Sequence, residues 1–172
     1  MKELVERLLF LARHDKKTLM LEMEVFDPLE VLSEVHREAK LLSSAQNFEL
    51  SPAQNAKING DKGMIKQLMR ILVDNAIKYT PPGGSVTLGV RRDSKNCILS
   101  VSDTGAGISV EDLPKVFDRF YRCDDARKSL TSGHGLGLSI ARIIVVAHGG
   151  KLKVRSKVGA GTTFSVILPL ED

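Results

Sequence analysis

Two pairs of short apolar runs with period-two alternation are the feature that most restricts how this chain can fold. The first pair occupies residues 86–90 and 97–101, and the second occupies residues 151–156 and 162–168. A short polar or glycine-containing turn separates the two runs of each pair. Alternating runs joined in this way are typical of β-hairpins with one buried face. The sequence therefore predicts an antiparallel or mixed sheet.

Apolar residues at helical spacing indicate that helices alternate with these hairpins. The predicted helices span residues 2–14, 27–42, 61–79 and 136–147. Shorter strands are predicted at residues 19–25, 48–50 and 56–58. Asp27-Pro28 supplies an N-cap and a first-turn proline for the second helix, whereas the apolar stripe of the first helix has no obvious partner. The expected fold is α+β: a two-layer sandwich in which helices cover one face of a mixed sheet.

The length and composition of the chain limit the classes of function open to it. A chain of 172 residues fits one globular domain with a short appendage. Its net charge of +4 is spread over interleaved acidic and basic residues, and it contains no Trp, so nucleic-acid binding is not expected. No apolar run approaches the roughly 18 residues of a membrane helix. We expect a soluble, cytoplasmic segment whose two cysteines, Cys97 and Cys123, stay reduced.

A carboxylate followed by two glycines closes the first hairpin, in the string Asp103-Thr104-Gly105-Ala106-Gly107. The carboxylate can accept a hydrogen bond, and glycines let a planar ligand approach the backbone. The same string is typical of a simple turn. Alone, it leaves both interpretations open.

A second glycine-rich segment, Gly133 to Leu138, opens the last predicted helix. Glycines before a helix N-terminus expose backbone amides and the positive end of the helix dipole to phosphate. The segment is not a Walker A motif, because no Gly-Lys-Ser or Gly-Lys-Thr follows it, and no strand immediately precedes it as in a Rossmann fingerprint. A different kind of phosphate site is indicated.

Asn75 and Lys78 lie three residues apart on the long predicted helix and therefore share one face. An amide oxygen can bind a hard cation, and an ammonium group can bind phosphate. An ordinary solvated helix end would look the same. The pair gains meaning only together with the two glycine-rich segments.

The order and spacing of these three elements resemble the ATPase domain of sensor histidine kinases, which has the Bergerat-type ATP-binding fold. Phe117 to Arg122, between the glycine-rich segments, and Gly159 to Phe164, after them, belong to the same resemblance. It spans residues 27–170. It implies that the chain binds ATP with Mg²⁺ and donates the γ-phosphoryl group to a histidine on a separate domain.

The resemblance also implies a nucleotide-binding role for each matching residue. Asn75 would hold Mg²⁺ while Lys78 and Tyr79 contact the nucleotide. Asp103 would face the adenine amine, and Tyr121 and Arg122 would approach the ribose and phosphates. Residues 133–138 would anchor a lid formed by residues 122–132. The implied ATP-binding residues are Asn75, Lys78, Tyr79, Asp103, Gly105, Gly107, Ile108, Tyr121, Arg122, Gly133, His134, Gly135, Leu136, Gly137 and Leu138.

By the same resemblance, the chain has two parts. Residues 1–18 are similar to the end of the second helix of the dimerisation and phosphoacceptor domain, and residues 19–172 are the catalytic domain. The implied partners are that phosphoacceptor domain and a response regulator, in a homodimeric parent that is often membrane-anchored. His14 ends the first helix, but only about a dozen residues separate it from Asp27, so it is not expected to be the acceptor. The chain is therefore not expected to phosphorylate itself.

Two positions depart from the family pattern. Ile71 stands one turn before Asn75, where family members usually carry Asn and related ATPases an acid. Isoleucine cannot act as a general base, so no catalytic residue is assigned. His134 stands where a small hydroxyl residue is usual, and we interpret it as part of the lid. Two alternatives to the kinase stay open. An ATPase that drives conformational change would need an acid at position 71, so Ile71 disfavours it, whereas a nucleotide-binding module without turnover is compatible with Ile71.

Overall fold

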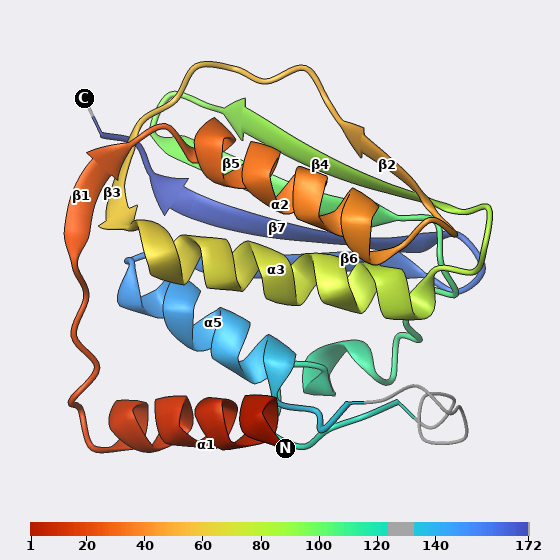
Figure 1. Ribbon diagram of the computed structural model, residues 1–172, viewed down its shortest axis with the longest axis horizontal. Helices are drawn as coiled ribbons and strands as arrows, with labels where there is room; N and C mark the ends of the chain where they lie inside the picture. Colours follow the sequence, from red (N-terminus) through yellow and green to blue (C-terminus); the bar gives the residue numbers. More distant parts are fainter. Residues whose placement is uncertain (124–132, 172) are drawn as a thin grey trace.

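The computed structural model describes residues 1–123 and 133–171 and contains one mixed five-stranded sheet (Figure 1). Its strand order is β2-β4-β5-β7-β6, in which only the β2-β4 pair is parallel. The five strands are β2 (Asn47–Leu50), β4 (Ser85–Arg92), β5 (Asn96–Asp103), β7 (Gly161–Pro169) and β6 (Lys151–Lys157). Both predicted hairpins are confirmed, β4 with β5 and β6 with β7.

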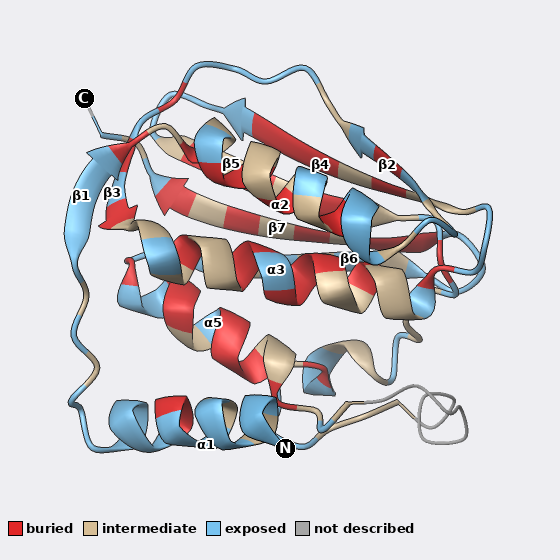
Figure 2. Cartoon of the chain, in the orientation of Figure 1, coloured by how far each residue is buried: buried red, intermediate tan, exposed pale blue. Residues whose placement is uncertain are grey.

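Three helices cover one face of this sheet: α2 (Pro28–Leu42), α3 (Lys62–Tyr79) and α5 (Gly137–Ala147) (Figure 1). Buried and half-buried residues alternate along β7, as a strand with one covered face requires (Figure 2). The core lies between the layers and includes Leu32, Leu72 and Ile144 from the helices and Leu88, Leu99 and Val166 from the strands. The predicted α+β two-layer sandwich is confirmed.

Aspartates start two of these helices. The Asp27 carboxylate accepts a hydrogen bond from the Leu29 backbone N–H at 2.8 Å, before α2. The Asp61 carboxylate accepts one from the Met64 backbone N–H at 2.9 Å, before α3. Each bond satisfies an amide that has no partner within the helix, which is why the helices begin at these positions.

The strand predicted at residues 19–25 is too long. The structure begins this strand, β1 (Met23–Phe26), only at Met23, and it pairs antiparallel with β3 (Ile58–Asp61) in a separate two-stranded ribbon. β3 ends at Asp61, which pairs with Met23 and is also the N-cap of α3. The residues before Met23 therefore have no β3 residue with which to pair. β3 itself lies two residues later than the predicted strand at residues 56–58. These boundaries depend on long-range pairing, which period-two alternation does not reveal.

The first helix, α1 (Lys2–Asp15), has a partner within the chain, contrary to the sequence-based expectation. It packs beside α5, and its Phe10 and Leu11 are buried in the core (Figure 1). The Asp15 carboxylate also forms two hydrogen bonds with the Arg119 guanidinium, at 2.8 and 3.0 Å. Val5, Leu8 and Leu9 lie outside this contact and are exposed. The helix is therefore attached to the domain along one stripe only.

The state of the cysteines and the length of the helices can also be read from the described residues. No disulfide joins the two cysteines, and Cys97 is buried in the sheet. Among the helices of residues 1–123 and 133–171, none is both long and apolar enough to cross a membrane.

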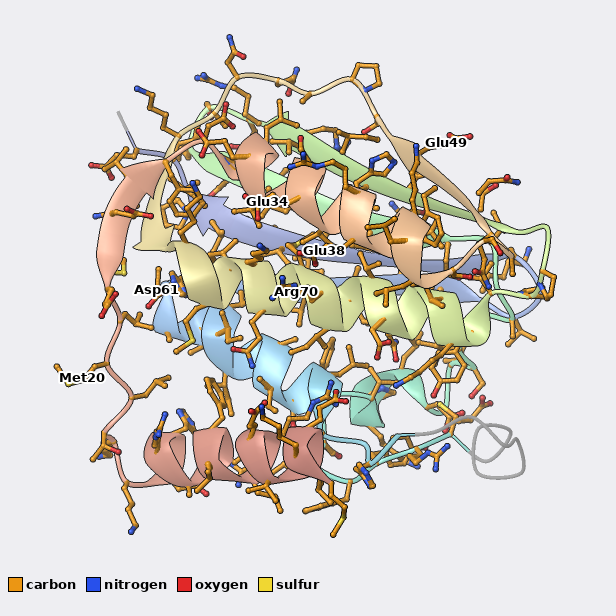
Figure 3. The ribbon with its side chains drawn as sticks, in the orientation of Figure 1. Met20, Glu34, Glu38, Glu49, Asp61 and Arg70 are labelled. Carbon is orange, nitrogen blue, oxygen red and sulfur yellow. The ribbon has the colours of Figure 1, made fainter. Side chains whose placement is uncertain are left out.

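A ladder of ion pairs joins α2 to α3 on their outer surface (Figure 3). Lys62 pairs with Glu30 at 2.6 Å. Lys66 pairs with Glu34, and the Arg70 guanidinium donates two hydrogen bonds to Glu38 at 2.7 and 2.8 Å. These hydrogen bonds lower the pKa of the Glu34 and Glu38 carboxyls, because they favour the ionised form.

We expect acid to weaken the fold partly through this ladder. A carboxyl whose folded-state pKa is depressed contributes stability above its unfolded-state pKa, about 4.3 for Glu. That stability is lost as the pH falls through the lower folded-state pKa. Glu38→Gln should therefore lose less stability than the wild type between about pH 5 and pH 3. Urea unfolding over this range measures the effect, and Glu49→Gln, at an exposed position of β2, is the control (Figure 3). An unchanged acid dependence in Glu38→Gln would contradict the prediction.

Candidate functional site

A pocket of about 290 Å³ opens where α3, the end of β5 and the start of α5 meet. All but two of the predicted site residues line it. They are Asn75, Lys78, Tyr79, Asp103, Gly107, Ile108, Tyr121, Arg122, Gly133, His134, Gly135, Gly137 and Leu138. The two exceptions have structural surroundings: Leu136 is fully buried in the core, and Gly105 packs against the Tyr79 carbonyl. The structure thus brings together segments that are distant in the sequence.

One face of α3 forms a wall of the pocket. Asn75 and Lys78 both line it, as their spacing of three residues predicts. Leu68, Leu72 and Ala76 are buried in the core and fix the rotation of the helix. The Lys78 ammonium pairs with the Asp74 carboxylate at 2.9 Å, and its side chain is only 26% exposed. A cation is therefore held at the pocket wall.

Asp103 is the last residue of β5, and a backbone amide holds its carboxylate. Its Oδ1 accepts a hydrogen bond from the Gly105 N–H at 2.8 Å. Thr162 lies directly opposite Asp103 in the β5-β7 ladder. Burial raises the pKa of Asp103, although the backbone N–H groups of Gly105 and Thr162 act in the opposite direction. The residue therefore organises the turn and also presents a rigid, partly desolvated carboxyl to the pocket.

Gly107 lets the loop after β5 pass close to the β6-β7 turn. Its φ is +77°, and an added Cβ would lie 2.2 Å from the Lys157 carbonyl oxygen. A side chain there would have to displace backbone, so only glycine fits. The close approach places Ile108 and Val158 in the same pocket wall.

The glycine-rich segment 133–138 leads into α5. Gly135 has a φ of +71°, and an added Cβ would lie 2.7 Å from backbone atoms of Phe120 and Tyr121. The N-cap position of α5 is Leu136, whose side chain caps nothing. Leu136 thus provides no side-chain cap for the first amides of α5, and Gly137 lines the pocket. This arrangement favours an anion at the helix N-terminus.

Several pocket residues escaped the sequence analysis. Asp112, close to η1 (Leu113–Lys115), accepts hydrogen bonds from the Tyr121 hydroxyl and, at 2.9 Å, from the Ser109 hydroxyl. The bond from Tyr121 lowers the pKa of Asp112 and holds the tyrosine ring at the pocket. No local pattern around residue 112 signals this contact. Cys123 lines the pocket as part of the predicted lid, and the sequence analysis assigned no contact with the nucleotide to the remaining lining residues Arg7, Asp74, Ala106, Ser109, Val116, Val158, Thr162 and Phe164.

The predicted lid lies mostly outside the described residues. The structure describes Arg122 and Cys123, which line the pocket, and resumes at Gly133. The prediction for residues 124–132 therefore stays a prediction.

Comparison with protein families gives one match that covers most of the chain. The family described as "Histidine kinase-, DNA gyrase B-, and HSP90-like ATPase" matches residues 60–172. This range contains α3, both hairpins, α5 and every lining residue except Arg7.

Individual relatives agree with this match. The sensor-like histidine kinase SenX3 of Mycobacterium bovis is 34% identical over 169 residues, which are 97% of this chain and 41% of SenX3. The structure of the mycobacterial sensor histidine kinase MprB has a TM-score of 0.78 at 31% identity, covering 86% of this chain and 99% of that one. Full-length ShkA in complex with AMPPNP has a TM-score of 0.80 at 27% identity, covering 98% of this chain and 35% of ShkA. The chain thus spans about two fifths of the length of SenX3.

Proposed function

This chain belongs to the histidine kinase-, DNA gyrase B- and HSP90-like ATPase family and matches the catalytic ATP-binding domain of sensor histidine kinases, and from that premise we propose that its pocket binds Mg-ATP. We propose further that it donates the γ-phosphoryl group to a histidine on the phosphoacceptor domain of a longer parent protein. The AMPPNP bound to ShkA, a non-hydrolysable ATP analogue, supports the choice of nucleotide.

The observation that carries the proposal is the order of groups along α3. Tyr79 lies near the end of α3 and packs against the turn that Asp103 organises. Asn75 is one turn earlier, and Ile71, beside Gly137, is one turn earlier still. Ile71 and Tyr79 are eight positions apart, which corresponds to about 12 Å along the helix axis. The Asp103 carboxyl, the Asn75 amide oxygen and the N-terminus of α5 therefore follow one another along the pocket. This is the order of the base, the metal ion and the phosphates in an extended Mg-nucleotide.

The residues present fit a magnesium ion that is shared with phosphate. Among residues 1–123 and 133–171, no three His, Cys, Asp or Glu side chains gather as a metal site. Mg²⁺ bound with a nucleotide takes most of its ligands from phosphate and water and only one or two from protein oxygens. Asn75 offers such an oxygen in the pocket. When bound, the ion would offset phosphate charge, while Lys78 places a second cation at the same wall.

Ile71 weighs against the rival function of a stand-alone ATPase. Its side chain is 7% exposed and lines the pocket where a hydrolase of this family would need an acid. Isoleucine has no lone pair and cannot activate water. Asp74 also lines the pocket, but its carboxylate is paired with Lys78. We therefore infer that any base for transfer comes from the acceptor domain.

The rest of the proposal concerns the parent protein. Residues 1–18 would be the end of a dimerisation and phosphoacceptor helix, and residues 19–172 the catalytic domain. The parent would be a homodimer, often membrane-anchored, that passes phosphate to a response regulator. SenX3, which is named as a histidine kinase and is longer than this chain, supports this arrangement.

One assay separates the candidate functions: release of phosphate and transfer of radiolabel from ATP, with and without a supplied phosphoacceptor domain. Transfer only in the presence of that domain is the expected result. Phosphate release without an acceptor would favour the stand-alone ATPase. Nucleotide binding with neither reaction would favour a module without turnover.

The chain by itself should not become phosphorylated on histidine. His14 is exposed at the end of α1 and lies outside the pocket lining. Incubation with γ-labelled ATP should therefore leave no acid-labile, alkali-stable label on the protein. A His14→Ala variant serves as the control, since it should behave as the wild type does. Label that maps to His14 would overturn the prediction.

A further inference from the structure

Arg7 of α1 reaches the pocket, although α1 precedes the region of the family match. It lines the pocket together with Ile71 and Gly137. One of its guanidinium nitrogens would lie 3.4 Å from a Cβ built on Gly137, which places it beside the first residue of α5. Its side chain is only 17% exposed. A largely buried cation is thus held next to a helix N-terminus.

The position of Arg7 identifies the end of the pocket that it serves. Asp103 and Tyr79 lie at the opposite end of the α3 wall, and Asn75 lies between the two ends. If the base occupies the Asp103 end and the metal is at Asn75, the phosphate farthest from the base lies toward Ile71 and Gly137. Among the described residues that line the pocket, Arg7 places a basic side chain beside Gly137 at that end.

Ile71 explains why a polar contact at this end of the pocket comes from Arg7 of α1 and not from α3. Its Cγ2 would lie 3.2 Å from a Cβ on Gly137, so an apolar side chain occupies the α3 position beside the first residue of α5. The α3 wall therefore offers no polar side chain at this position. The guanidinium of Arg7 supplies hydrogen-bond donors there from a different element, in the planar geometry that suits phosphate oxygens.

The present partner of Arg7 can be replaced by a phosphate. Arg7 pairs with Glu3 at 2.7 Å, one turn earlier on α1, and the Glu3 side chain is 75% exposed. Glu3 is the solvated partner of this i,i+4 pair, and solvent screening of its carboxylate weakens the pair. A phosphate group carries more charge than a carboxylate and is met in the pocket by the dipole of α5 as well.

We propose that Arg7 binds the terminal phosphate of the nucleotide, so that the docking of α1 distinguishes ATP from ADP. This inference rests on the proposed nucleotide function of the pocket. The coupling between nucleotide binding and the docking of α1 acts equally in both directions. If docked α1 strengthens triphosphate binding through Arg7, bound triphosphate must also stabilise the docking of α1 against α5. The diphosphate lacks the group that Arg7 contacts and should affect α1 less.

Calorimetric titration of Arg7→Ala with magnesium and a non-hydrolysable ATP analogue, and in parallel with Mg-ADP, tests the proposal. The variant should lose about tenfold in affinity for the triphosphate, the effect of losing a hydrogen bond between charged groups. Its affinity for ADP should change by less than about twofold. Arg13→Ala is the matched control, because it removes the same charge from the same helix outside the pocket and should change neither affinity.

Hydrogen exchange of α1 in the wild-type chain provides a second readout that needs no variant. Its amides should exchange more slowly with the ATP analogue than with ADP. The role of Arg7 would be overturned if Arg7→Ala lost affinity equally for both nucleotides, or lost affinity for neither. Equal exchange rates of the α1 amides with the ATP analogue and with ADP would also overturn it. If the wild type binds neither nucleotide, the proposed function itself fails. Binding that is intact in the wild type and unchanged in Arg7→Ala refutes only the present inference.

Discussion

Asp103→Asn should weaken ATP binding by about ten- to a hundredfold while leaving the domain folded. The carboxylate is proposed to accept a hydrogen bond from the adenine amine. In the variant, the asparagine NH2 group would face that amine, and two donors cannot form a hydrogen bond. The asparagine oxygen can still accept the bond that Asp103 now receives from the Gly105 N–H at 2.8 Å. This substitution therefore separates base recognition from turn geometry. Asp103→Ala removes both, so its loss of affinity should be accompanied by some loss of stability.

The other turn aspartate of the same hairpin provides a matched control. Asp93 accepts hydrogen bonds from the Lys95 and Asn96 backbone N–H groups, both at 2.8 Å, and lies outside the pocket lining. Asp93→Ala should lower the melting temperature without changing ATP affinity. Wild-type affinity in Asp103→Asn, or preference of the wild-type chain for GTP over ATP, would refute the adenine assignment. Calorimetric titration combined with thermal unfolding measures both quantities.

The raised pKa of Asp103 predicts how replacing this residue changes the stability of the domain at neutral pH. A folded-state pKa above the unfolded value of about 3.9 contributes stability below that value, and this stability is lost as the pH rises through the folded-state pKa. At neutral pH the ionised carboxyl is therefore not a source of stability through burial. Asp103→Asn should accordingly keep or raise the neutral-pH melting temperature, because the neutral amide avoids the desolvation of a charge.

Asn75→Ala should remove most of the dependence of ATP binding on magnesium. The alanine variant loses the amide oxygen that α3 presents to the pocket, and a hard cation requires oxygen ligands. We expect Mg-ATP affinity to fall by about tenfold or more. Affinity measured in EDTA should change little. Titrations with magnesium and with EDTA give the two values for each variant.

Two further variants make this test specific. Asn75→Asp keeps an oxygen at the same position and should retain more magnesium dependence than the alanine variant. Asn59→Ala removes an exposed amide from β3, outside the pocket, and should behave as the wild type. Equal ratios of the two affinities in Asn75→Ala and in the wild type would exclude Asn75 as the magnesium ligand.

Most of the secondary structure could be predicted because it depends on contacts between near neighbours in the chain. The side chains of Asp27 and Asp61 cap α2 and α3 through amides two and three residues away. The β4-β5 hairpin follows from alternation and a four-residue turn. The failures occur where a partner distant in the sequence sets the boundary. β1 starts at Met23 because β3 ends at Asp61, and β2 pairs in parallel with β4 across all of α3.

The candidate site divides in the same way. The helical spacing of Asn75 and Lys78 and the glycines around Asp103 and before α5 are readable as motifs, although each alone also suits an ordinary turn or helix end. Arg7 and Asp112 carry no such signal. Each reaches the pocket through side-chain packing between segments that are far apart or irregular, and no local motif marks either residue as part of a site.

What the sequence by itself determined is therefore the set of elements, their order and the residue types that end them, because period, caps and turns act within a few residues. The tertiary structure alone decided which of those ends meet. It placed Asp103 against Thr162, Gly137 against Ile71, and Arg7 beside both Gly137 and Ile71. The physical reason is that burial depends on which faces pack together, and the chemistry of the pocket arises from groups that no local pattern brings into contact.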